Sequence, residues 1–375
     1  MERALTPYLK EYMDRKIILL TGPRQSGKTT ISKMITPDYD YLNHDNHEHR
    51  LLIREKAWDR SKELIILDEL HKMKDWKSWL KGIYDTEGLT PKILVTGSAK
   101  LDTYRKMGDS LAGRYFQYRL HPLDIREISQ IEGKQDRTLT QQMIRTGGFP
   151  EPFLEGTETF YNRWKRSHSD IILRQDMLEL ESLQHISTIE TLIQLLRQRV
   201  GSPVSWNSLA RDLGCSDKSV KKWVQILEEM YVIFQIHPFH RNVARALLKS
   251  PKIYFYDTGQ VLGDSGSQLE NMVACSLLKE IHFRQDCLGQ NYDLNYVRTK
   301  NGQEIDFLIT HDEEPDTLIE VKWADDQPSR HFKFFSQYLP IQRQIQLVEE
   351  LNREKTYPEG LEIRKVNHWL SEMPF

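Results

Sequence analysis

A glycine-rich segment near the start of the chain has the residue types and spacing of a phosphate-binding loop. Residues 22–29 complete the pattern G-x-x-x-x-G-K-[ST] directly after the apolar run 17–20. In such a loop the backbone N–H groups converge on the β- and γ-phosphates, Lys28 adds a positive charge, and Thr29 offers a hydroxyl to Mg²⁺. A glycine turn with a surface lysine is the alternative, but the strand and helix patterns around the loop favour phosphate binding. The predicted nucleotide-binding residues, with ATP and Mg²⁺ as cofactors, are Gly22, Pro23, Arg24, Gln25, Ser26, Gly27, Lys28, Thr29, Thr30 and Ser98.

Two acids after another apolar run are predicted to complete this site. Residues 64–67 are apolar and lead into Asp68 and Glu69. A buried strand here would place both carboxylates at the edge of a parallel sheet where ligands bind. We expect Asp68 to hold Mg²⁺ together with Thr29, and Glu69 to orient and deprotonate an attacking water. Because acids after an apolar strand are common, this interpretation depends on the phosphate-binding loop.

Two further groups are candidates for contact with the γ-phosphate. The apolar strand 93–95 ends in a Thr-Gly-Ser tip, where Ser98 or Thr96 could sense the phosphate. A simple turn explains that tip equally well. Arg114 directly precedes the fifth predicted strand and is a candidate catalytic residue that would neutralise charge in its own or a neighbouring subunit. The alternative is an ordinary solvated arginine.

The chain alternates short apolar runs with amphipathic stretches over residues 1–120, which predicts an α/β fold with a parallel sheet flanked by helices. The pattern turns helical from about 121 to 195, and a second α/β segment follows Pro251. The predicted strands of the first sheet lie near Lys16–Thr21, Tyr39–Asn43, Leu64–Asp68, Lys92–Thr96 and Tyr115–Leu120.

A basic helix-turn-helix is predicted in the middle of the chain. Apolar residues between 209 and 227 repeat with the spacing of two helices, and Gly214 allows the turn. The second helix would carry Lys218, Lys221 and Lys222 on its other face, where a recognition helix meets nucleic acid, with DNA favoured. Since the formal net charge of the chain is only -2, any such surface must be local. A solvated face of a packing module is the alternative.

A second group of acids lies near the C-terminus. Asp306, Glu320 and Lys322 form the pattern D-x13-E-x-K on two adjacent predicted strands. This pattern resembles the core of the PD-(D/E)xK nucleases, and Glu270 resembles the first-helix acid of such sites. The resemblance implies Mg²⁺ or Mn²⁺ held by Glu270, Asp306 and Glu320, with Lys322 polarising the attacking water. A hairpin with a cross-strand charge cluster is the alternative.

The motifs together resemble the AAA-type P-loop ATPases of bacteria and archaea that carry a restriction-endonuclease-like C-terminal domain. The resemblance implies a P-loop core with sheet order 5-1-4-3-2, a helical lid, a winged helix and a C-terminal α/β nuclease-like domain. The expected boundaries are 1–125, 126–195, 196–250 and 251–375. The motifs are GPRQSGKTT, LIILDEL, VTGSA, SLAGRY, HPLDIREI, GGFPEP and HPFHRNVARALLKSPKIYFYDTG.

Three functional hypotheses follow. The first is an ATP-driven protein that acts on nucleic acid, with a metal-dependent nuclease site in its C-terminal domain. The second is a nucleotide-dependent switch or scaffold whose C-terminal domain binds DNA or protein without cleavage. The third is a small-molecule kinase, which has little use for the basic and carboxylate modules. A homo-oligomer stays an open alternative, because AAA-type enzymes are commonly hexamers.

The lengths of the apolar runs and the spacing of the cysteines indicate where in the cell the protein is expected. No apolar run approaches the roughly 20 residues that cross a bilayer, so we expect no membrane partner. Three widely spaced cysteines fit reduced thiols better than a disulfide framework. We therefore expect a cytoplasmic protein.

Overall fold

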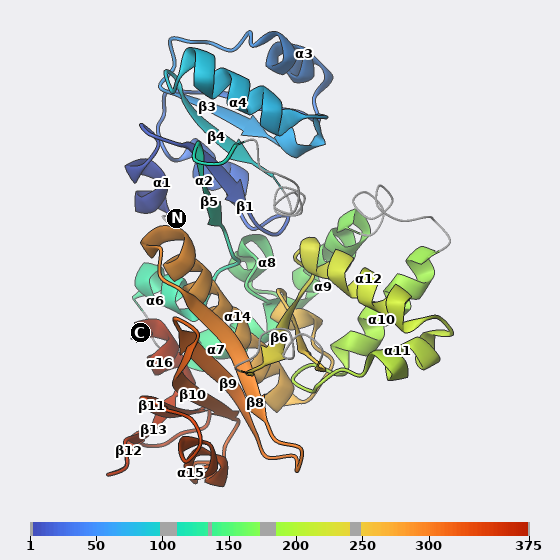
Figure 1. Ribbon diagram of the computed structural model, residues 1–375, viewed down its shortest axis with the longest axis vertical. Coiled ribbons are helices and arrows are strands. Elements are labelled where there is room, and N and C mark those ends of the chain that lie inside the picture. The colour runs from blue at the N-terminus through green and yellow to red at the C-terminus, as the bar shows by residue number, and fades with distance from the viewer. Residues whose placement is uncertain (1–2, 98–110, 134–136, 173–184, 241–248, 374–375) are drawn as a thin grey trace. The chain divides into compact units, whose positions relative to one another are not determined.

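The chain divides into two compact units, which are described separately (Figure 1). The computed structural model describes residues 3–97, 111–133, 137–172, 185–240 and 249–373. The first unit runs to His121 and takes in Glu229–Tyr231 and Asp286–Gly289, and the second unit holds the rest.

The first unit is built on a five-stranded parallel sheet. Its order is β2-β3-β4-β1-β5, which confirms the expected order 5-1-4-3-2 read from the other edge. The strands lie within a residue of their predicted bounds, because each central strand is a short, fully apolar run with a polar end. They are β1 (Ile17–Thr21), β2 (Tyr39–Asn43), β3 (Leu64–Asp68), β4 (Lys92–Thr96) and β5 (Tyr115–Arg119).

Helices cover both faces of this sheet. Side chains alternate along a strand, so Ile65 and Leu67 join one apolar core with residues of α3 and α4, whereas Leu64 and Ile66 join the other core with residues of α1 and α2. This double burial explains why β3 has no alternating polar pattern. The helices are α1 (Thr6–Glu11), α2 (Lys28–Lys33), α3 (His47–Glu55), the 3₁₀ turn η1 (Leu70–Lys72) and α4 (Trp76–Glu87).

The second unit begins with helices and contains the predicted helix-turn-helix. Gly214 ends α11 in the left-handed conformation, and the Ser216 hydroxyl accepts a hydrogen bond from Ser219 N at the start of α12. Buried Val220 and Leu227 hold α12 in place, as their spacing predicted. The helices are α6 (Ile125–Glu132), α7 (Arg137–Thr146), α8 (Pro150–Glu155), α9 (Glu158–Ile171), α10 (Ile186–Arg197), α11 (Trp206–Leu213) and α12 (Asp217–Glu229).

The rest of the second unit forms around an eight-stranded mixed sheet of order β12-β13-β11-β10-β9-β8-β6-β7. Helix α14 leads into β8, β9 and β10, which pair antiparallel in turn, and α15 then leads into β11, which lies parallel to β10. The elements are β6 (Ile233–Pro238), β7 (Lys252–Phe255), η6 (Thr258–Gln260), α14 (Ser265–Leu288), β8 (Tyr292–Arg298), β9 (Glu304–His311), β10 (Glu314–Lys322), α15 (Arg330–Ser336), β11 (Arg343–Val348), β12 (Lys355–Thr356), β13 (Leu361–Lys365) and α16 (Val366–Glu372).

The division into units does not mark the four expected domains. It falls at His121, and β6 and β7 share one sheet with the C-terminal strands across the expected boundary at 250/251. The four-part division therefore stays a prediction. Within the described residues, no helix combines the length and the hydropathy that crossing a bilayer requires.

Helix α14 is fastened to β7 by one buried amide. Asn271 is fully buried; its Oδ1 accepts from Phe255 N at 2.8 Å, and its Nδ2 donates to Phe255 O at 2.9 Å. The amide thus satisfies both backbone groups of a residue on an edge strand. This contact fixes the position of β7 relative to the helix.

We predict that Asn271→Ala lowers the free energy of unfolding of the second unit by about 1–3 kcal/mol, because it leaves the buried Phe255 N unpaired and Phe255 O with only the Cys275 thiol as donor. Urea denaturation followed by circular dichroism measures the loss. Ser265→Ala, at an exposed position in the same helix, is the control and should change stability by less than about 0.5 kcal/mol. Equal effects of the two substitutions would contradict the assigned role of the amide.

Candidate functional site

Glycine allows the close turn that joins β1 to α2. Gly22 and Gly27 have φ angles of 141° and 97°, which L side chains rarely adopt. A Cβ at Gly22 would overlap the carbonyl oxygen of Leu120. The other predicted loop residues lie in the same turn, except Thr30, which is in the first turn of α2. They are Pro23, Arg24, Gln25 and Ser26.

The ammonium group of Lys28 is held by carbonyl oxygens of the phosphate-binding loop. Lys28 is only 7% exposed, and its Nζ donates to the carbonyl oxygens of Gly22 at 2.9 Å and Pro23 at 2.6 Å. The hydroxyl of Ser26 is buried and has no hydrogen-bond partner in the described part of the chain. A fixed ammonium and an unsatisfied hydroxyl in one turn fit the oxygens of a phosphate group.

Arg3 fastens this loop, and the sequence analysis missed it. Its guanidinium is buried and donates to Ser26 O at 3.1 Å and to His121 O at 2.7 Å. It therefore ties the segment before α1 to the phosphate-binding loop and to the end of β5. No motif predicts this contact, because Arg3 lies outside every recognisable pattern and reaches the loop only through the tertiary fold.

The carboxylate of Asp68 is the centre of a hydrogen-bond network at the carboxyl edge of the sheet. Oδ2 accepts from Thr29 Oγ1 at 3.0 Å and from the hydroxyl of Tyr41 at 2.6 Å. Oδ1 accepts from Thr96 Oγ1 and from Glu69 N. Thr29 and Asp68 thus present adjacent hydroxyl and carboxylate oxygens, which are the ligands that Mg²⁺ prefers. These residues fit the predicted magnesium site.

Tyr41 is a second residue that the sequence analysis missed. It comes from the edge strand β2, and burial followed by its hydrogen bond to Asp68 raises the pKa of its hydroxyl well above the ordinary value. Asn43, two residues on and on the same side of the strand, donates to the Tyr41 oxygen at 3.1 Å. Polar residues at alternate positions near the carboxyl end of β2 were the signal that could have found it.

Glu69 lies beside this network in a strained backbone position. Its φ angle is 55°, and its N–H donates to Thr96 O at 3.0 Å. Burial raises the pKa of the Glu69 carboxyl, while the positive charges of Lys72 and Arg24 oppose that rise. The carboxylate lies 3.6 Å from both His71 Nε2 and Lys72 Nζ. A partly desolvated carboxylate at this edge is suited to accept a proton from water.

The expected contact of Arg114 with a phosphate in its own subunit is wrong. Its carbonyl oxygen accepts from Ile17 N at the start of β1, whereas the loop follows the end of β1. Its guanidinium pairs with Asp85 at 2.7 Å. Because β1 and β5 are parallel, a residue before β5 lies at the edge opposite the loop. The contact with a neighbouring subunit stays a prediction, and Ser98 lies outside the described residues.

The predicted C-terminal acids converge in the second unit. Asp306 Oδ2 on β9 accepts from Val321 N on β10 at 2.9 Å, and Lys322 Nζ lies 2.7 Å from Glu320 Oε1. Burial, followed by the charge of Asp306, raises the pKa of Glu270 and of Glu320. The acids that the sequence pattern grouped are therefore neighbours in the structure. We call Glu270, Glu304, Asp306 and Glu320 the carboxylate cluster.

An unpredicted lysine lies inside the carboxylate cluster. Lys252, on β7, has a side chain that is 0% exposed, with Nζ 3.2 Å from Glu270, 2.8 Å from Glu304 and 3.4 Å from Asp306. Burial by itself lowers the pKa of Lys252, but the three carboxylates raise it above its usual range. Within the described residues, no group of three or more His, Cys, Asp or Glu side chains is placed to hold a metal ion. The cluster therefore does not fit the expected Mg²⁺ or Mn²⁺.

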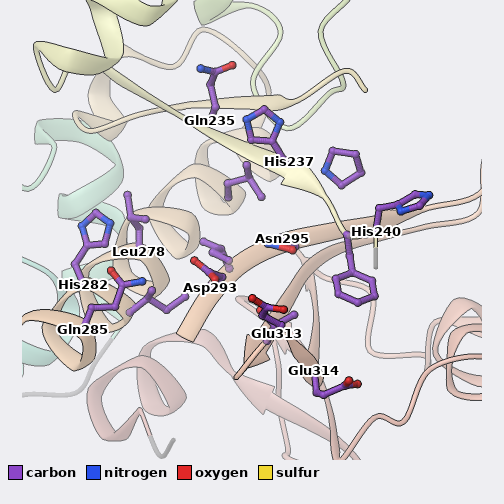
Figure 2. A pocket seen from close by; sticks show the side chains of 16 residues that line it. Gln235, His237, His240, Leu278, His282, Gln285, Asp293, Asn295, Glu313 and Glu314 are labelled. Atoms are coloured by element: carbon purple, nitrogen blue, oxygen red, sulfur yellow. The ribbon is translucent and has the colours of Figure 1, made fainter. Parts of the chain in front are cut away.

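A separate cavity of about 600 Å³ lies between β6, α14, β8 and the β9–β10 turn (Figure 2). None of the predicted site residues lines it, and neither lysine nor arginine is among its lining residues. Its polar lining includes the imidazoles of His237, His240 and His282 and the carboxylates of Asp293, Glu313 and Glu314.

Comparison with family models places an AAA domain at residues 14–129. Most of the first unit thus matches an AAA-type ATPase domain. Two further models cover most of the remaining chain: a domain of unknown function (DUF8612) at 137–262, and another (DUF4143) at 265–366.

Two relatives in sequence have names that state no activity. An uncharacterized protein of Mycobacterium tuberculosis is 26% identical over 65% of this chain, which spans 54% of that relative. An uncharacterized protein of Methanocaldococcus jannaschii is 24% identical over 78% of this chain and 72% of that protein. The chain thus spans about half the length of the mycobacterial relative. The RuvB Holliday junction branch migration motor of Thermotoga maritima is 17% identical with a TM-score of 0.33, over 62% of this chain and 87% of that one.

We predict that Tyr41→Phe raises the Mg²⁺ concentration for half-maximal ATP hydrolysis about fivefold, because it removes one donor that orients Asp68, worth ~1 kcal/mol. A magnesium titration of phosphate release measures it. Tyr39→Phe, two positions earlier on β2, is the matched control and should leave the requirement unchanged. An unchanged requirement in Tyr41→Phe would contradict the role given to this hydroxyl.

Proposed function

We propose that the chain is an ATP-driven protein that hydrolyses ATP at the loop between β1 and α2 and acts on nucleic acid, with DNA favoured. The observation that supports it most is the position of Asp68, whose carboxylate accepts hydrogen bonds from Thr29, Tyr41 and Thr96 beside the fixed ammonium of Lys28. This arrangement supplies cation, magnesium ligand and base at one edge of one sheet.

Each residue of the site has a distinct part in the proposed reaction. Lys28 exchanges its carbonyl partners for phosphate oxygens, and Thr29 and Asp68 hold Mg²⁺, which supplies charge neutralisation when bound. Glu69 accepts the proton of the attacking water, and its raised pKa makes it a stronger base than an exposed glutamate. A hydrolysis site needs such a base, whereas a kinase would deliver the phosphoryl group to a bound acceptor.

The basic face of α12 supports action on nucleic acid. Lys218 and Lys221 are exposed on this helix, and Lys221 pairs with Asp217 at only 3.2 Å across one turn. An exposed ion pair of this kind exchanges readily, so its lysine remains able to meet a phosphate. The antiparallel pair β6–β7 follows the two helices, which supports the interpretation of this segment as a winged helix.

The C-terminal domain is proposed to bind without cleavage. Its element order of one helix, three antiparallel strands, one helix and a parallel strand supports a nuclease-like fold. The position of Lys252 among the acids favours the switch or scaffold hypothesis over metal-dependent cleavage. ATP turnover would then change how the two units present their surfaces.

We predict that Glu69→Gln lowers kcat for ATP hydrolysis by about 10²–10⁴-fold while ATP still binds, because it removes the base and leaves the phosphate contacts. Lys28→Ala should weaken ATP binding itself. Phosphate release and calorimetry measure the two effects. Glu63→Gln, an exposed carboxylate just before the same strand, is the matched control. Full hydrolysis in Glu69→Gln would remove the proposed mechanism.

We predict that reversing Lys218 and Lys221 to glutamate weakens DNA binding and makes its salt dependence shallower by about one unit of slope for each lost phosphate contact. Fluorescence anisotropy at several salt concentrations measures both. Reversal of Lys10 and Lys74, two exposed lysines of the first unit, is the control with the same charge change. If both pairs of substitutions weaken binding equally, α12 is not the nucleic-acid surface.

A further inference from the structure

The amine of Lys252 lies against Glu270 and Asp306, two of the three acids that were predicted to hold a metal ion in the C-terminal domain. We infer that this ammonium is the permanent cation of the carboxylate cluster and that the cluster binds no divalent ion. The inference rests on the proposed function in one respect, since both take the C-terminal domain to act without cleaving nucleic acid. Its direct observation is a fully buried Nζ within 3.4 Å of Glu270, Glu304 and Asp306.

The backbone keeps this ammonium in place. Lys252 opens β7, pairs with Ile236 of β6, and forms a further bridge to Pro203. The Asn271 amide fixes Phe255 at the other end of the same strand. The ring of Tyr296 lies 5.5 Å from Nζ, where its face attracts the cation. The backbone of Lys252 is therefore held on both sides, which keeps its ammonium next to the carboxylates.

Each acid of the cluster already has a partner on at least one carboxylate oxygen, whereas Glu320 Oε2 is buried without a hydrogen-bond partner among the described residues. Asp306 Oδ1 faces Lys252, and its Oδ2 accepts from Val321 N at 2.9 Å. Glu270 Oε1 accepts from Lys252 and from the hydroxyl of Tyr254 at 2.6 Å. A magnesium or manganese ion needs several oxygens at about 2.0–2.2 Å in regular geometry. An ion on these oxygens would lie next to a fixed positive charge, which repels it.

Charge balance explains the presence of a lysine inside the carboxylate cluster. Without Lys252, Glu270 and Asp306 would lose the ammonium that lies against both of them, and Glu304 would keep only its pair with the half-exposed Arg298. Like charges at such distances oppose one another. Lys322 makes its ion pair with Glu320, at 2.7 Å, and its side chain is 38% exposed, so solvent screens its charge more than that of Lys252. Of these two lysines, the buried one balances the charge of Glu270, Glu304 and Asp306.

The test is a titration of the full chain with Mn²⁺ in the absence of nucleotide. The EPR signal of free Mn²⁺ reports how much of the ion is bound. The wild-type chain should bind no Mn²⁺ that depends on Asp306. Lys252→Met should bind Mn²⁺ at least about tenfold more tightly than wild type, because it removes the repelling charge. That binding should be lost when Asp306→Asn is added. Asp68→Asn in every chain removes any contribution from the nucleotide site.

Two control variants keep the test decisive. Lys252→Arg retains the positive charge and should bind no Mn²⁺. Lys322→Met removes the other lysine but leaves Lys252 in place, so this variant should also bind no Mn²⁺. Wild-type binding of Mn²⁺ that Asp306→Asn abolishes would overturn the inference. A folded Lys252→Met chain that still binds no Mn²⁺ would overturn it as well. If Lys252→Met does not fold, the wild-type and Lys252→Arg titrations decide.

The outcomes also separate this inference from the proposed function. Mn²⁺ bound at Asp306 without any nicking of plasmid DNA would overturn the role of Lys252 and leave the non-cleaving function intact. Mn²⁺-dependent nicking that Asp306→Asn abolishes would overturn both. Loss of ATP hydrolysis in Glu69→Gln is independent of either result.

Discussion

The hydrogen bonds to the carboxylate of Asp68 are the interaction on which the account of the first unit depends. They join four separate parts of the chain: Thr29 from the helix after the loop, Tyr41 from β2, Thr96 from β4, and the Glu69 N–H that follows β3. A parallel sheet makes this possible, because the carboxyl ends of its strands lie along one edge. The fold thus brings together the carboxylate proposed to hold Mg²⁺, the ammonium of Lys28 and the carboxylate of Glu69 that is proposed to act as the base.

In the second unit, the carboxylates of the cluster lie close together, and positively charged side chains of the same unit compensate their charge. Four carboxylates lie on neighbouring elements, and Lys252, Lys322 and Arg298 form ion pairs with them. A buried ion pair of this kind contributes little net stability, but removal of one partner leaves an uncompensated charge and is costly. The arrangement therefore fixes the position of β7 against β9 and α14. Conformational change in this unit is expected to move these elements as one body.

The sequence predicted most of what depends on local pattern. Apolar runs with polar ends identified the three central strands of the first sheet, β1, β3 and β4, and the spacing of Val220 and Leu227 identified α12, because both signals lie within a few residues. The same local logic grouped Asp306 with Glu320 across adjacent strands. The nucleotide loop was recognisable because phosphate binding needs glycine at fixed offsets.

Tertiary contacts were beyond that reasoning. Arg3, Tyr41 and Lys252 each reach their site from a strand or segment distant in sequence, and apart from the alternating polar residues of β2 around Tyr41, no spacing rule indicates them. Arg114 was misplaced for a simpler reason: a residue before a parallel strand lies at the amino edge, while the ligand edge is at the other end. Strand direction, combined with the predicted sheet order, was sufficient to exclude it.

The central claim is that residues 22–29 and Asp68 together bind a magnesium–nucleotide complex. The most direct measurement is calorimetric titration of the folded wild-type chain with a nonhydrolysable ATP analogue, with and without Mg²⁺. The account predicts uptake of one nucleotide per chain and clearly tighter binding when Mg²⁺ is present. No uptake, or uptake that is indifferent to Mg²⁺, would contradict it.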